Sequence, residues 1–318
     1  MPADEPDAAS VEPVAGTDHH VHLLGPDLIR DWKAIGIPFS RPDSAYLIPD
    51  SVLTRVDRAV LVPMGHAYGN TELRTALALS VDEEERRVAR ENDHLLAQAA
   101  RFADRTVALC SAPVLRPYAL RELERCITAG GAGIKLHLAA SEIALRDTSH
   151  LGSILQLAGW AAAESLPVLL HLDTQRRGTE AEDVDRFLRV VIEPHLDLVV
   201  IIAHLGGSGG YGAWTRSVFR TANAWLAERF AADDPRPGIH FELSAAILAE
   251  ESEGVPATTE REAAALAADL DEFGTDRLLF GSDAPSFDPA RYAALLVERG
   301  VLTREEVATI ARRSPLSK

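Results

Sequence analysis

Short apolar runs recur along the chain, and longer segments with helical spacing separate them. Eight of these runs have the length and continuous apolar character of β-strands that are buried on both faces. They cover residues 17–24, 58–64, 106–114, 133–138, 168–172, 198–205, 239–244 and 277–283. The helical segments include 151–165, 182–192, 214–230 and 259–273, and several begin at a residue suited to capping a helix. The pattern therefore predicts alternating strands and helices.

Eight strands that each precede a helix predict an α/β protein, a (β/α)₈ TIM barrel with a parallel sheet covered on its outer side. The rival is a doubly wound open sheet. Such a sheet usually carries a glycine-rich phosphate loop after its first strand, whereas this chain reads DHHVHLL from residue 18. The barrel is the favoured architecture.

The domain organisation follows from two segments that break the alternation. Residues 1–13 are rich in Pro, Ala, Asp and Glu without periodicity, so we expect a mobile acidic tail. Residues 25–56 contain four prolines and are long for a loop, which predicts an insertion over the barrel mouth that could serve as a lid. Residues 14–318 are expected to form one domain.

Composition and charge narrow the class of partner. The chain has 318 residues, of which 47% are hydrophobic, and a formal net charge of −16. Long-range repulsion disfavours nucleic acids and anionic membranes, so we expect a small-molecule substrate. The acidic start does not resemble a signal peptide, and no apolar run is long enough to cross a bilayer, which favours the cytoplasm. The sequence is compatible with a monomer or a homo-oligomer.

The chain contains only two cysteines, Cys110 and Cys126. Two are too few for a disulfide framework, and their spacing does not match a thiolate metal site. Any metal ion must therefore be held by nitrogen and oxygen ligands.

Side chains suited to such ligation stand where the predicted strands end. His20 and His22 share one face of the first strand, because side chains alternate faces along a strand. Five further candidates lie at the ends of later strands: Lys135, His137, His171, His204 and Asp283. In a barrel all strand ends surround one mouth, where barrel enzymes place their active sites. Residues more than a hundred positions apart are therefore expected to converge.

Imidazoles and a carboxylate suit Zn²⁺ or another first-row divalent ion such as Mn²⁺. A catalytic ion keeps one position open for water, ionises that water near neutral pH and polarises the carbonyl under attack. The predicted chemistry needs neither a serine nor a cysteine nucleophile.

The strand-end motifs resemble those of a known family. His20-x-His22, GIKLH at 133–137, AHLGG at 203–207 and FGSDAP at 280–285 look like the signatures of the amidohydrolase superfamily, and of its amidohydrolase-related branch. That branch holds lactonases, amide hydrolases and metal-dependent decarboxylases on TIM barrels. The resemblance covers roughly residues 14–318, with the motifs in the family's order.

The resemblance implies roles for individual residues. His20, His22, His171 and Asp283 match the ligands of a single-metal site, and Asp283 would also pass the proton of the attacking water to the leaving group. In two-metal members a carboxylated lysine bridges the ions and the strand-6 histidine binds the second one. Lys135 and His204 occupy those places. In single-metal members that histidine contacts water or substrate, so His204 has a role either way.

Lys135 has alternatives that do not involve carboxylation. A lysine in an apolar strand must reach solvent, find a carboxylate such as Asp18 or Glu242, or be modified, because an unpaired buried ammonium is costly. The sequence leaves these open, and with them the choice between one and two ions.

Three residues are candidates for substrate binding: His137, His66 and Arg176. The favoured reaction is hydrolysis of an amide, lactone or related ester. The alternative is non-oxidative decarboxylation of an unsaturated or aromatic acid at the same metal, and a third possibility is a binding protein without metal. The intact ligand set argues against the third.

Overall fold

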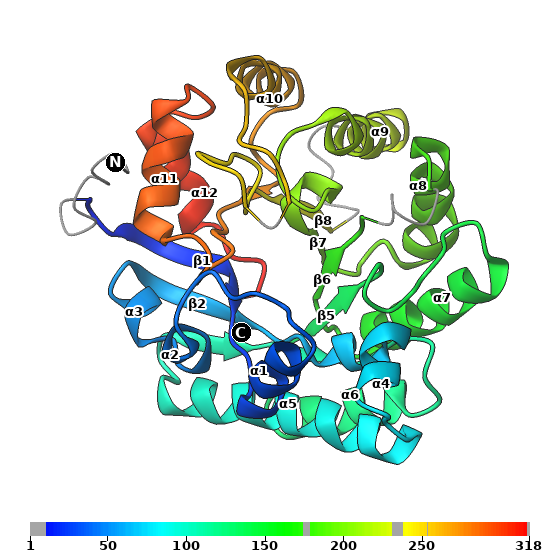
Figure 1. Ribbon diagram of the computed structural model, residues 1–318. Helices are drawn as coiled ribbons and strands as arrows, with labels where there is room; N and C mark the ends of the chain where they lie inside the picture. The colour runs from blue at the N-terminus through cyan, green and yellow to red at the C-terminus, as the bar shows by residue number, and fades with distance from the viewer. Residues whose placement is uncertain (1–10, 174–178, 231–237, 253, 317–318) are drawn as a thin grey trace.

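The structure is a computed structural model that describes residues 11–173, 179–230, 238–252 and 254–316. Its strands are parallel and surrounded by helices, which is the predicted TIM barrel (Figure 1). Nine strand segments fill eight positions, because β3 and β4 are separated only by Leu109. The strands are β1 (Val14–His22), β2 (Val56–Val62), β3 (Thr106–Ala108), β4 (Cys110–Ser111), β5 (Ile134–His137), β6 (Val168–His171), β7 (Val200–Ile202), β8 (Ile239–Glu242) and β9 (Leu278–Leu279).

Neighbouring strands pair in sequence order, first β1-β2-β3 and then β4 through β9. Backbone hydrogen bonds continue the pairing from β9 to β1: His19 N donates to Phe280 O at 3.0 Å, and Asp283 N donates to His20 O at 3.0 Å. These bonds bring the first and last strands side by side. Closure matters for function, since it places His20 against Asp283 although the two residues are 263 positions apart in the chain (283 − 20 = 263).

Helices cover the outer side of the barrel (Figure 1). They are α1 (Pro26–Ala34), α2 (Asp43–Leu47), α3 (Asp50–Leu53), α4 (Thr71–Ala76), α5 (Val81–Arg101), α6 (Ala119–Thr128), α7 (Thr148–Ala163), α8 (Ala181–Phe187), α9 (Ala213–Arg229), α10 (Glu260–Phe273), α11 (Pro289–Glu298) and α12 (Arg304–Arg312). Thr259 and Thr303 cap α10 and α12 through reciprocal bonds with the third helical residue of each. Among the described residues, no helix has the length and apolar character needed to span a membrane.

The core has two parts that follow the alternation of the strands. Ile134, Leu136 and other outward residues pack under the helices in one large cluster. Inward residues form a smaller apolar cluster inside the barrel, which includes Val60, Leu169 and Leu279. Leu316 joins this inner cluster, and Arg313 beside it donates to Thr275 O and Leu278 O before and in β9. The C-terminal segment therefore closes the end of the barrel opposite the strand-end histidines.

Two predicted features differ from the structure in detail. The sixth predicted strand, residues 198–205, is longer than the strand in the structure, because β7 ends at Ile202. His204 and Leu205 take positive φ angles of 52° and 55°, which end the extended conformation and form a tight turn, η6 (Ala203–Gly206). The predicted insertion contains the three short helices α1, α2 and α3, with prolines at or just before their first residues. Its function as a lid stays a prediction, and residues 1–10 of the predicted tail lie outside the described residues.

Cys110 and Cys126 form a disulfide bond between β4 and α6. The count of two cysteines had suggested no disulfide framework, and this single cross-link shows that a pair can still meet. Both cysteines are fully buried. A side chain at Gly131 would lie 2.2 Å from Cys110 Sγ, so the bond also requires glycine there. Disulfides persist mainly in oxidising compartments, so the bond does not support the cytoplasmic location, which stays a prediction.

A buried carboxyl group holds the start of the insertion. Gly25 N donates to Glu91 Oε2 at 2.7 Å. Burial raises the pKa of Glu91 from 4.5 to about 8, against the lowering effect of the N–H groups of Gly25 and Met64. Glu91 in α5 thus connects the segment after β1 with the segment after β2. The folded state favours the protonated form of its carboxyl group.

We expect Glu91→Gln to flatten the pH dependence of stability. The folded state binds the Glu91 proton more tightly than the unfolded state, so its contribution is present below about pH 4.5 and is lost as pH rises toward about 8. Each unit of pKa difference corresponds to roughly 1.4 kcal/mol, so the total reaches a few kcal/mol. Urea unfolding of both proteins between pH 4 and 9 measures it. Parallel stability curves for the two proteins would contradict the assignment.

Candidate metal centre

The site begins with three inward side chains of β1. Asp18, the deepest, is fully buried. Its Oδ1 accepts hydrogen bonds from His20 N and Ser282 N, both at 3.0 Å, and its Oδ2 accepts one from Ser282 Oγ at 2.5 Å. Burial raises the pKa of Asp18 to about 7 although these bonds lower it. Asp18 therefore fastens β1 to the turn that follows β9, directly beneath His20 and Asp283.

His20, His22 and Asp283 bring three ligand atoms together. The Nε2 atoms of His20 and His22 are 3.1 Å apart, and Asp283 Oδ1 lies 3.6 Å from the first and 3.2 Å from the second. Ligand atoms at 2.0–2.1 Å from a tetrahedral zinc ion lie roughly 3.4 Å from one another. The observed spacing thus fits one face of a four-coordinate ion.

The chemistry of Asp283 also fits a cation. Its Oδ1 is buried and accepts no well-formed hydrogen bond, and its φ of 68° turns the carboxylate toward the two imidazoles. Burial alone would raise the pKa of Asp283, but the contact with His22 and the neighbouring imidazoles of His20 and His204 hold it well below the ordinary value. An ionised oxygen without a donor is the ligand that a divalent ion prefers.

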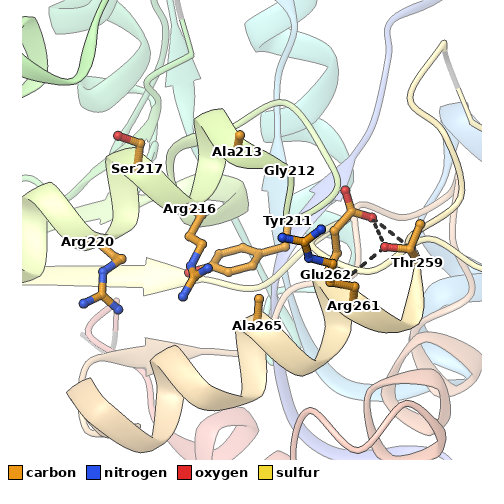
Figure 2. A pocket seen from close by; sticks show the side chains of 10 residues that line it. All are labelled: Tyr211, Gly212, Ala213, Arg216, Ser217, Arg220, Thr259, Arg261, Glu262 and Ala265. Atoms are coloured by element: carbon orange, nitrogen blue, oxygen red, sulfur yellow. Dashed lines mark hydrogen bonds between the residues drawn. The ribbon is translucent and has the colours of Figure 1, made fainter.

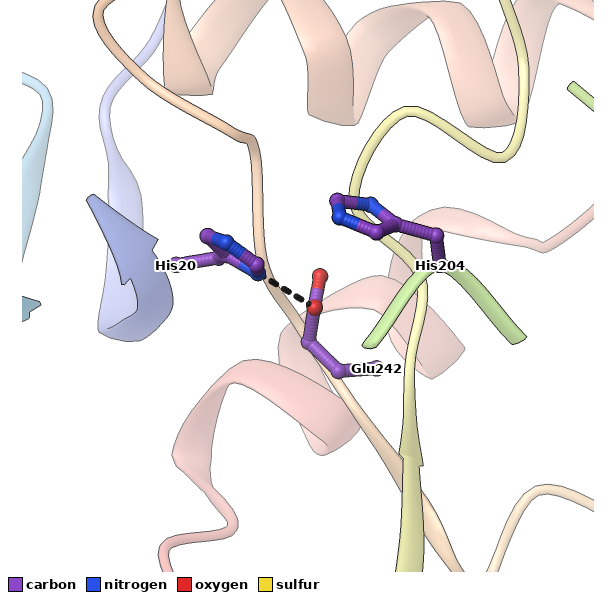
Figure 3. Close-up of side chains that lie close together, drawn as sticks. All are labelled: His20, His204 and Glu242. Carbon is purple, nitrogen blue, oxygen red and sulfur yellow. Dashed lines mark hydrogen bonds and ion pairs between the residues drawn. The ribbon is translucent and has the colours of Figure 1, made fainter. Parts of the chain in front are cut away.

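A second group of polar atoms lies on the other side of His20 (Figure 3). His20 Nδ1 is 2.8 Å from Glu242 Oε2, at the end of β8, and both side chains are fully buried. His204 Nδ1 lies 2.9 Å from Ser244 O and 2.8 Å from Ser244 Oγ. The ligand-type atoms of His20, His204 and Glu242 are close enough to form a second possible cation group. The two groups share His20.

Lys135 points from β5 into the same space. The side chain is fully buried, and Nζ lies 3.4 Å from His20 Nε2. Burial lowers the pKa of Lys135 to about 8, while the charges of Glu242 and Asp283 oppose that shift. Glu242, one of the two carboxylates that the sequence suggested as partners, therefore acts on the amine through its charge, together with Asp283.

A row of imidazoles continues from the cluster across the mouth. The ring of His137 stacks on that of His171 with centroids 3.8 Å apart, and the ring of His66 lies 5.2 Å from His137. Burial lowers the pKa values of these three rings and of His20 well below 6.5. The rings are thus neutral near pH 7, the state that metal ligation and hydrogen bonding to a neutral substrate both require.

A match to a known family decides the class of protein. The family model of the amidohydrolases matches residues 17–315, nearly the whole chain. The chain belongs to the amidohydrolase family. The resemblance noted in the strand-end motifs is thereby confirmed, while no curated protein matches the sequence.

Solved structures share this amidohydrolase barrel at low sequence identity. A 2,6-dihydroxybenzoate decarboxylase from Rhizobium has a TM-score of 0.58 at 16% identity, over 95% of this chain and 99% of its own. A dihydroxybenzoic acid decarboxylase from Polaromonas sp. JS666, with bound manganese and 2-nitroresorcinol, has a TM-score of 0.57 at 16% identity, over 96% and 99%. An amidohydrolase from Burkholderia multivorans with bound HEPES has a TM-score of 0.54 at 15% identity, over 95% and 100%. At these identities the likeness shows the fold.

The predicted site residues of this amidohydrolase fall into three groups. His20, His22 and Asp283 form the tight cluster, with Lys135 and His204 beside it. His66, His137 and His171 line the adjoining wall, so His171 belongs to neither possible cation group. Arg176 lies outside the described residues.

His171 has a hydrogen bond that bears on its predicted ligand role. Ser208 Oγ donates its proton to Asp173 Oδ2 at 2.7 Å, so it must accept from His171 Nε2–H, 2.9 Å away. To bind an ion through Nε2, His171 would have to give up this bond and its proton. Its ligation stays a prediction.

Glu242 and Ser244 are the residues that sequence reasoning missed as parts of the site. Glu242 had been considered only as a partner for Lys135, and Ser244 not at all. A signal was present, since Glu242 is a charged residue near the end of a mostly apolar run. Glu242 and Ser244 are two positions apart and therefore fall on the same face of the predicted strand. The same reasoning that selected Lys135 could have selected Glu242.

An open hollow of about 780 Å³ lies elsewhere, between α9 and α10 on the outside of the barrel (Figure 2). None of the predicted site residues lines it. Two of its arginines, Arg216 and Arg220, bind the buried carboxylate of Asp269, which also accepts a hydrogen bond from Tyr211. These contacts join α9 to α10, so the two arginines have a structural role.

Proposed function

We propose that this protein is a metal-dependent hydrolase that cleaves an amide, lactone or related ester bond of a small molecule. The observation that carries the proposal is the cluster of His20, His22 and Asp283. Its three ligand atoms have the separations that a four-coordinate ion requires, and its one anionic oxygen lacks a hydrogen-bond donor. We propose Zn²⁺ as the ion, with Mn²⁺ or another divalent ion as a substitute, and His171 as a further ligand.

When bound, the ion would supply a water of lowered pKa and polarisation of the reacting carbonyl. The chain's own residues would handle the protons. Asp283 is ionised and would accept the proton of the water and deliver it to the leaving group. His204 donates from Nδ1 to Ser244 O, so its Nε2 is left with a lone pair that can accept a proton from water or contact the substrate.

The row of imidazoles would bind the substrate. His137 Nδ1 accepts the N–H of Ala140 at 3.3 Å, which puts the ring proton on Nε2 as a donor. His66 is fully buried, and neither of its ring nitrogens has a hydrogen-bond partner among the described residues. Buried polar atoms are rarely left unpaired, so a substrate oxygen or a bound water is the expected partner. Arg176, which follows β6 in the sequence and lies outside the described residues, is proposed as a further contact.

The second candidate is decarboxylation of an unsaturated or aromatic acid at the same centre. It is favoured by a specific finding, since two of the three solved structures described above are dihydroxybenzoate decarboxylases. The same residues would hold the ion, and the carboxylic acid substrate would bind at that ion. The product separates the two reactions: a hydrolase releases titratable acid from an ester or lactone and an amine from an amide, whereas a decarboxylase releases CO₂. Screening both substrate classes with a pH-stat, an amine assay and a CO₂ assay is the test.

We expect the purified protein to contain close to one first-row divalent ion per chain or to gain one on reconstitution. Elemental analysis after dialysis measures the content, and chelation should abolish turnover until Zn²⁺, Mn²⁺ or Co²⁺ is added back. A protein that carries no such ion and gains no activity from any of the three would refute the proposed function in both of its forms.

A further inference from the structure

Glu242 makes two contacts that together determine where its neighbour His20 carries a proton. Its Oε1 accepts a hydrogen bond from Ser244 N, and its Oε2 lies 2.8 Å from His20 Nδ1. When Oε2 accepts as well, His20 carries its ring proton on Nδ1. The lone pair of the neutral ring is then on Nε2, the atom that faces His22 and Asp283.

His204 is held in the same way by Ser244, which lies two positions after Glu242. Its Nδ1 donates to Ser244 O at 2.9 Å, in a turn where His204 itself has a positive φ. Ser244 Oγ lies between the two rings, 2.8 Å from His204 Nδ1 and 3.3 Å from His20 Nδ1. The end of β8 therefore presents acceptors to the Nδ1 atoms of both histidines.

These bonds decide between the two possible cation groups. The nitrogen of His20 that lies beside Glu242 is Nδ1, 2.8 Å from Oε2, so an ion bound there by Glu242 and His204 would need the lone pair of Nδ1. The neutral ring would then carry its proton on Nε2. In that tautomer His20 could not serve the cluster with His22 and Asp283. The two groups compete for one imidazole, and the hydrogen bond to Glu242 favours the cluster with His22 and Asp283.

The close packing around Glu242 shows that its position is specified. A side chain at Gly281 would lie 2.2 Å from Glu242 Oε1 and 2.6 Å from its Cδ. The glycine of the segment Phe280-Gly281-Ser282-Asp283 thus leaves room for the carboxylate beside the ligand that follows it. Only glycine permits the segment after β9 to pass this close to Glu242.

We propose that Glu242 is a positioning residue that fixes the Nδ1–H tautomer of His20 and thereby commits His20 Nε2 to the metal cluster. The group His20, His204 and Glu242 is then a hydrogen-bond network and not a second cation site. The inference rests on the metal centre of the proposed function but not on which reaction it performs. Partners that orient a ligating histidine typically contribute about 10–100-fold to metal affinity.

Glu242→Gln tests the proposal with little change in volume. If the glutamine oxygen accepts from Ser244 N, its NH₂ group faces His20 Nδ1 and favours the Nε2–H tautomer. If the glutamine amide rotates by 180°, its NH₂ group faces the N–H of Ser244, so two donors oppose each other. We therefore expect Zn²⁺ and Co²⁺ affinity to fall about 10–100-fold. Glu91→Gln is the matched control, because it alters another buried glutamate outside the cluster and should leave metal affinity within about twofold.

The second readout is the tautomer itself, measured by ¹⁵N NMR of histidine-labelled, metal-free protein. His20 signals are assigned by their loss in His20→Gln. We expect Nδ1–H for His20 in the parent protein and in Glu91→Gln, and a shift toward Nε2–H in Glu242→Gln. Because the parent protein is measured without metal, this readout stands even if Glu242→Gln does not fold or the proposed function fails.

Two results would overturn the proposal. One is an Nε2–H tautomer of His20 in the parent protein. The other is a folded Glu242→Gln protein that keeps both the tautomer and the metal affinity of the parent. Gly281→Ala gives an independent check, since the added methyl group should displace the Glu242 carboxylate and weaken metal binding without changing any polar group. A parent protein that binds no metal but shows Nδ1–H would refute the metal centre and leave the Glu242 hydrogen bond intact.

Discussion

Asp283→Asn should abolish turnover while the barrel stays folded. The substitution keeps nearly the same volume but removes the anionic oxygen that faces His20 and His22. It also removes the proposed proton acceptor, and general acid–base catalysis alone contributes about 10²–10⁴-fold. Since the amide is also a weaker ligand, we expect a loss at the upper end of that range or beyond. The measurement is kcat/KM of the variant loaded with metal to the same content as the parent.

Asp288→Asn is the matched control for that experiment. Asp288 lies five residues further along, caps α11 and binds Arg55, and its carboxylate makes no contact in the metal cluster. Its loss should cost about 1 kcal/mol of stability and leave turnover unchanged. If metal-loaded Asp283→Asn keeps activity close to the parent, Asp283 does not move the proton, and His204 becomes the candidate base.

The order of the strands and the convergence of their ends could be predicted from the sequence because both depend on local patterns. Apolar runs mark the strands, and alternation along β1 puts His20 and His22 on one face. The barrel then carries Asp283 to them, as the bond from Asp283 N to His20 O shows. No side-chain detail was needed for that step.

The contacts within the site could not be predicted in the same way. Whether Glu242 meets His20 or Lys135 depends on the register of β8 against its neighbours and on the space left by Gly281. The hydrogen bond from His171 to Ser208 depends on how the glycine-rich segment after His204 folds back. Register and loop geometry arise from packing over the whole barrel, so a pattern in one segment does not reveal them.

The disulfide bond illustrates the same limit. Cys110 and Cys126 are 16 positions apart, a spacing that matches no motif, and each alone resembles a buried apolar residue. They meet because α6 packs back on β4, and the missing side chain of Gly131 leaves room for Cys110 Sγ. The cytoplasmic location, inferred from the acidic start and the lack of a long apolar run, is therefore less well supported than the fold inferred from the strands.

Lys135→Ala separates the one-metal from the two-metal form of this centre. Two metals would require a carboxylated Lys135 that provides an oxygen to each ion, whereas an ammonium beside a dication would be repelled. The atoms with metal-like spacing are those of His20, His22 and Asp283, and the neighbouring group is joined by hydrogen bonds. We therefore expect one ion per chain before and after the change.

Turnover of Lys135→Ala should still fall, by about 10²–10³-fold, if the amine stabilises charge that develops next to the ligands, as a single well-placed donor does. Lys135→Met is the volume-matched control, because it restores packing but not the amine, and it should be equally inactive. Metal content, turnover and rescue by bicarbonate, acetate or propionate are measured together.

Rescue of activity by short carboxylic acids distinguishes the one-metal from the two-metal form. A short carboxylic acid can enter the space left in Lys135→Ala and replace a lost carbamate bridge, but it cannot replace a lost ammonium. We expect no rescue and no change in metal content. A fall from two ions to one, with activity partly restored by the acids in Lys135→Ala but not in Lys135→Met, would instead show that the lysine is carboxylated. In the expected case His204 is left without a second ion to bind, and its Nε2, freed by the bond from Nδ1 to Ser244 O, acts on water or substrate.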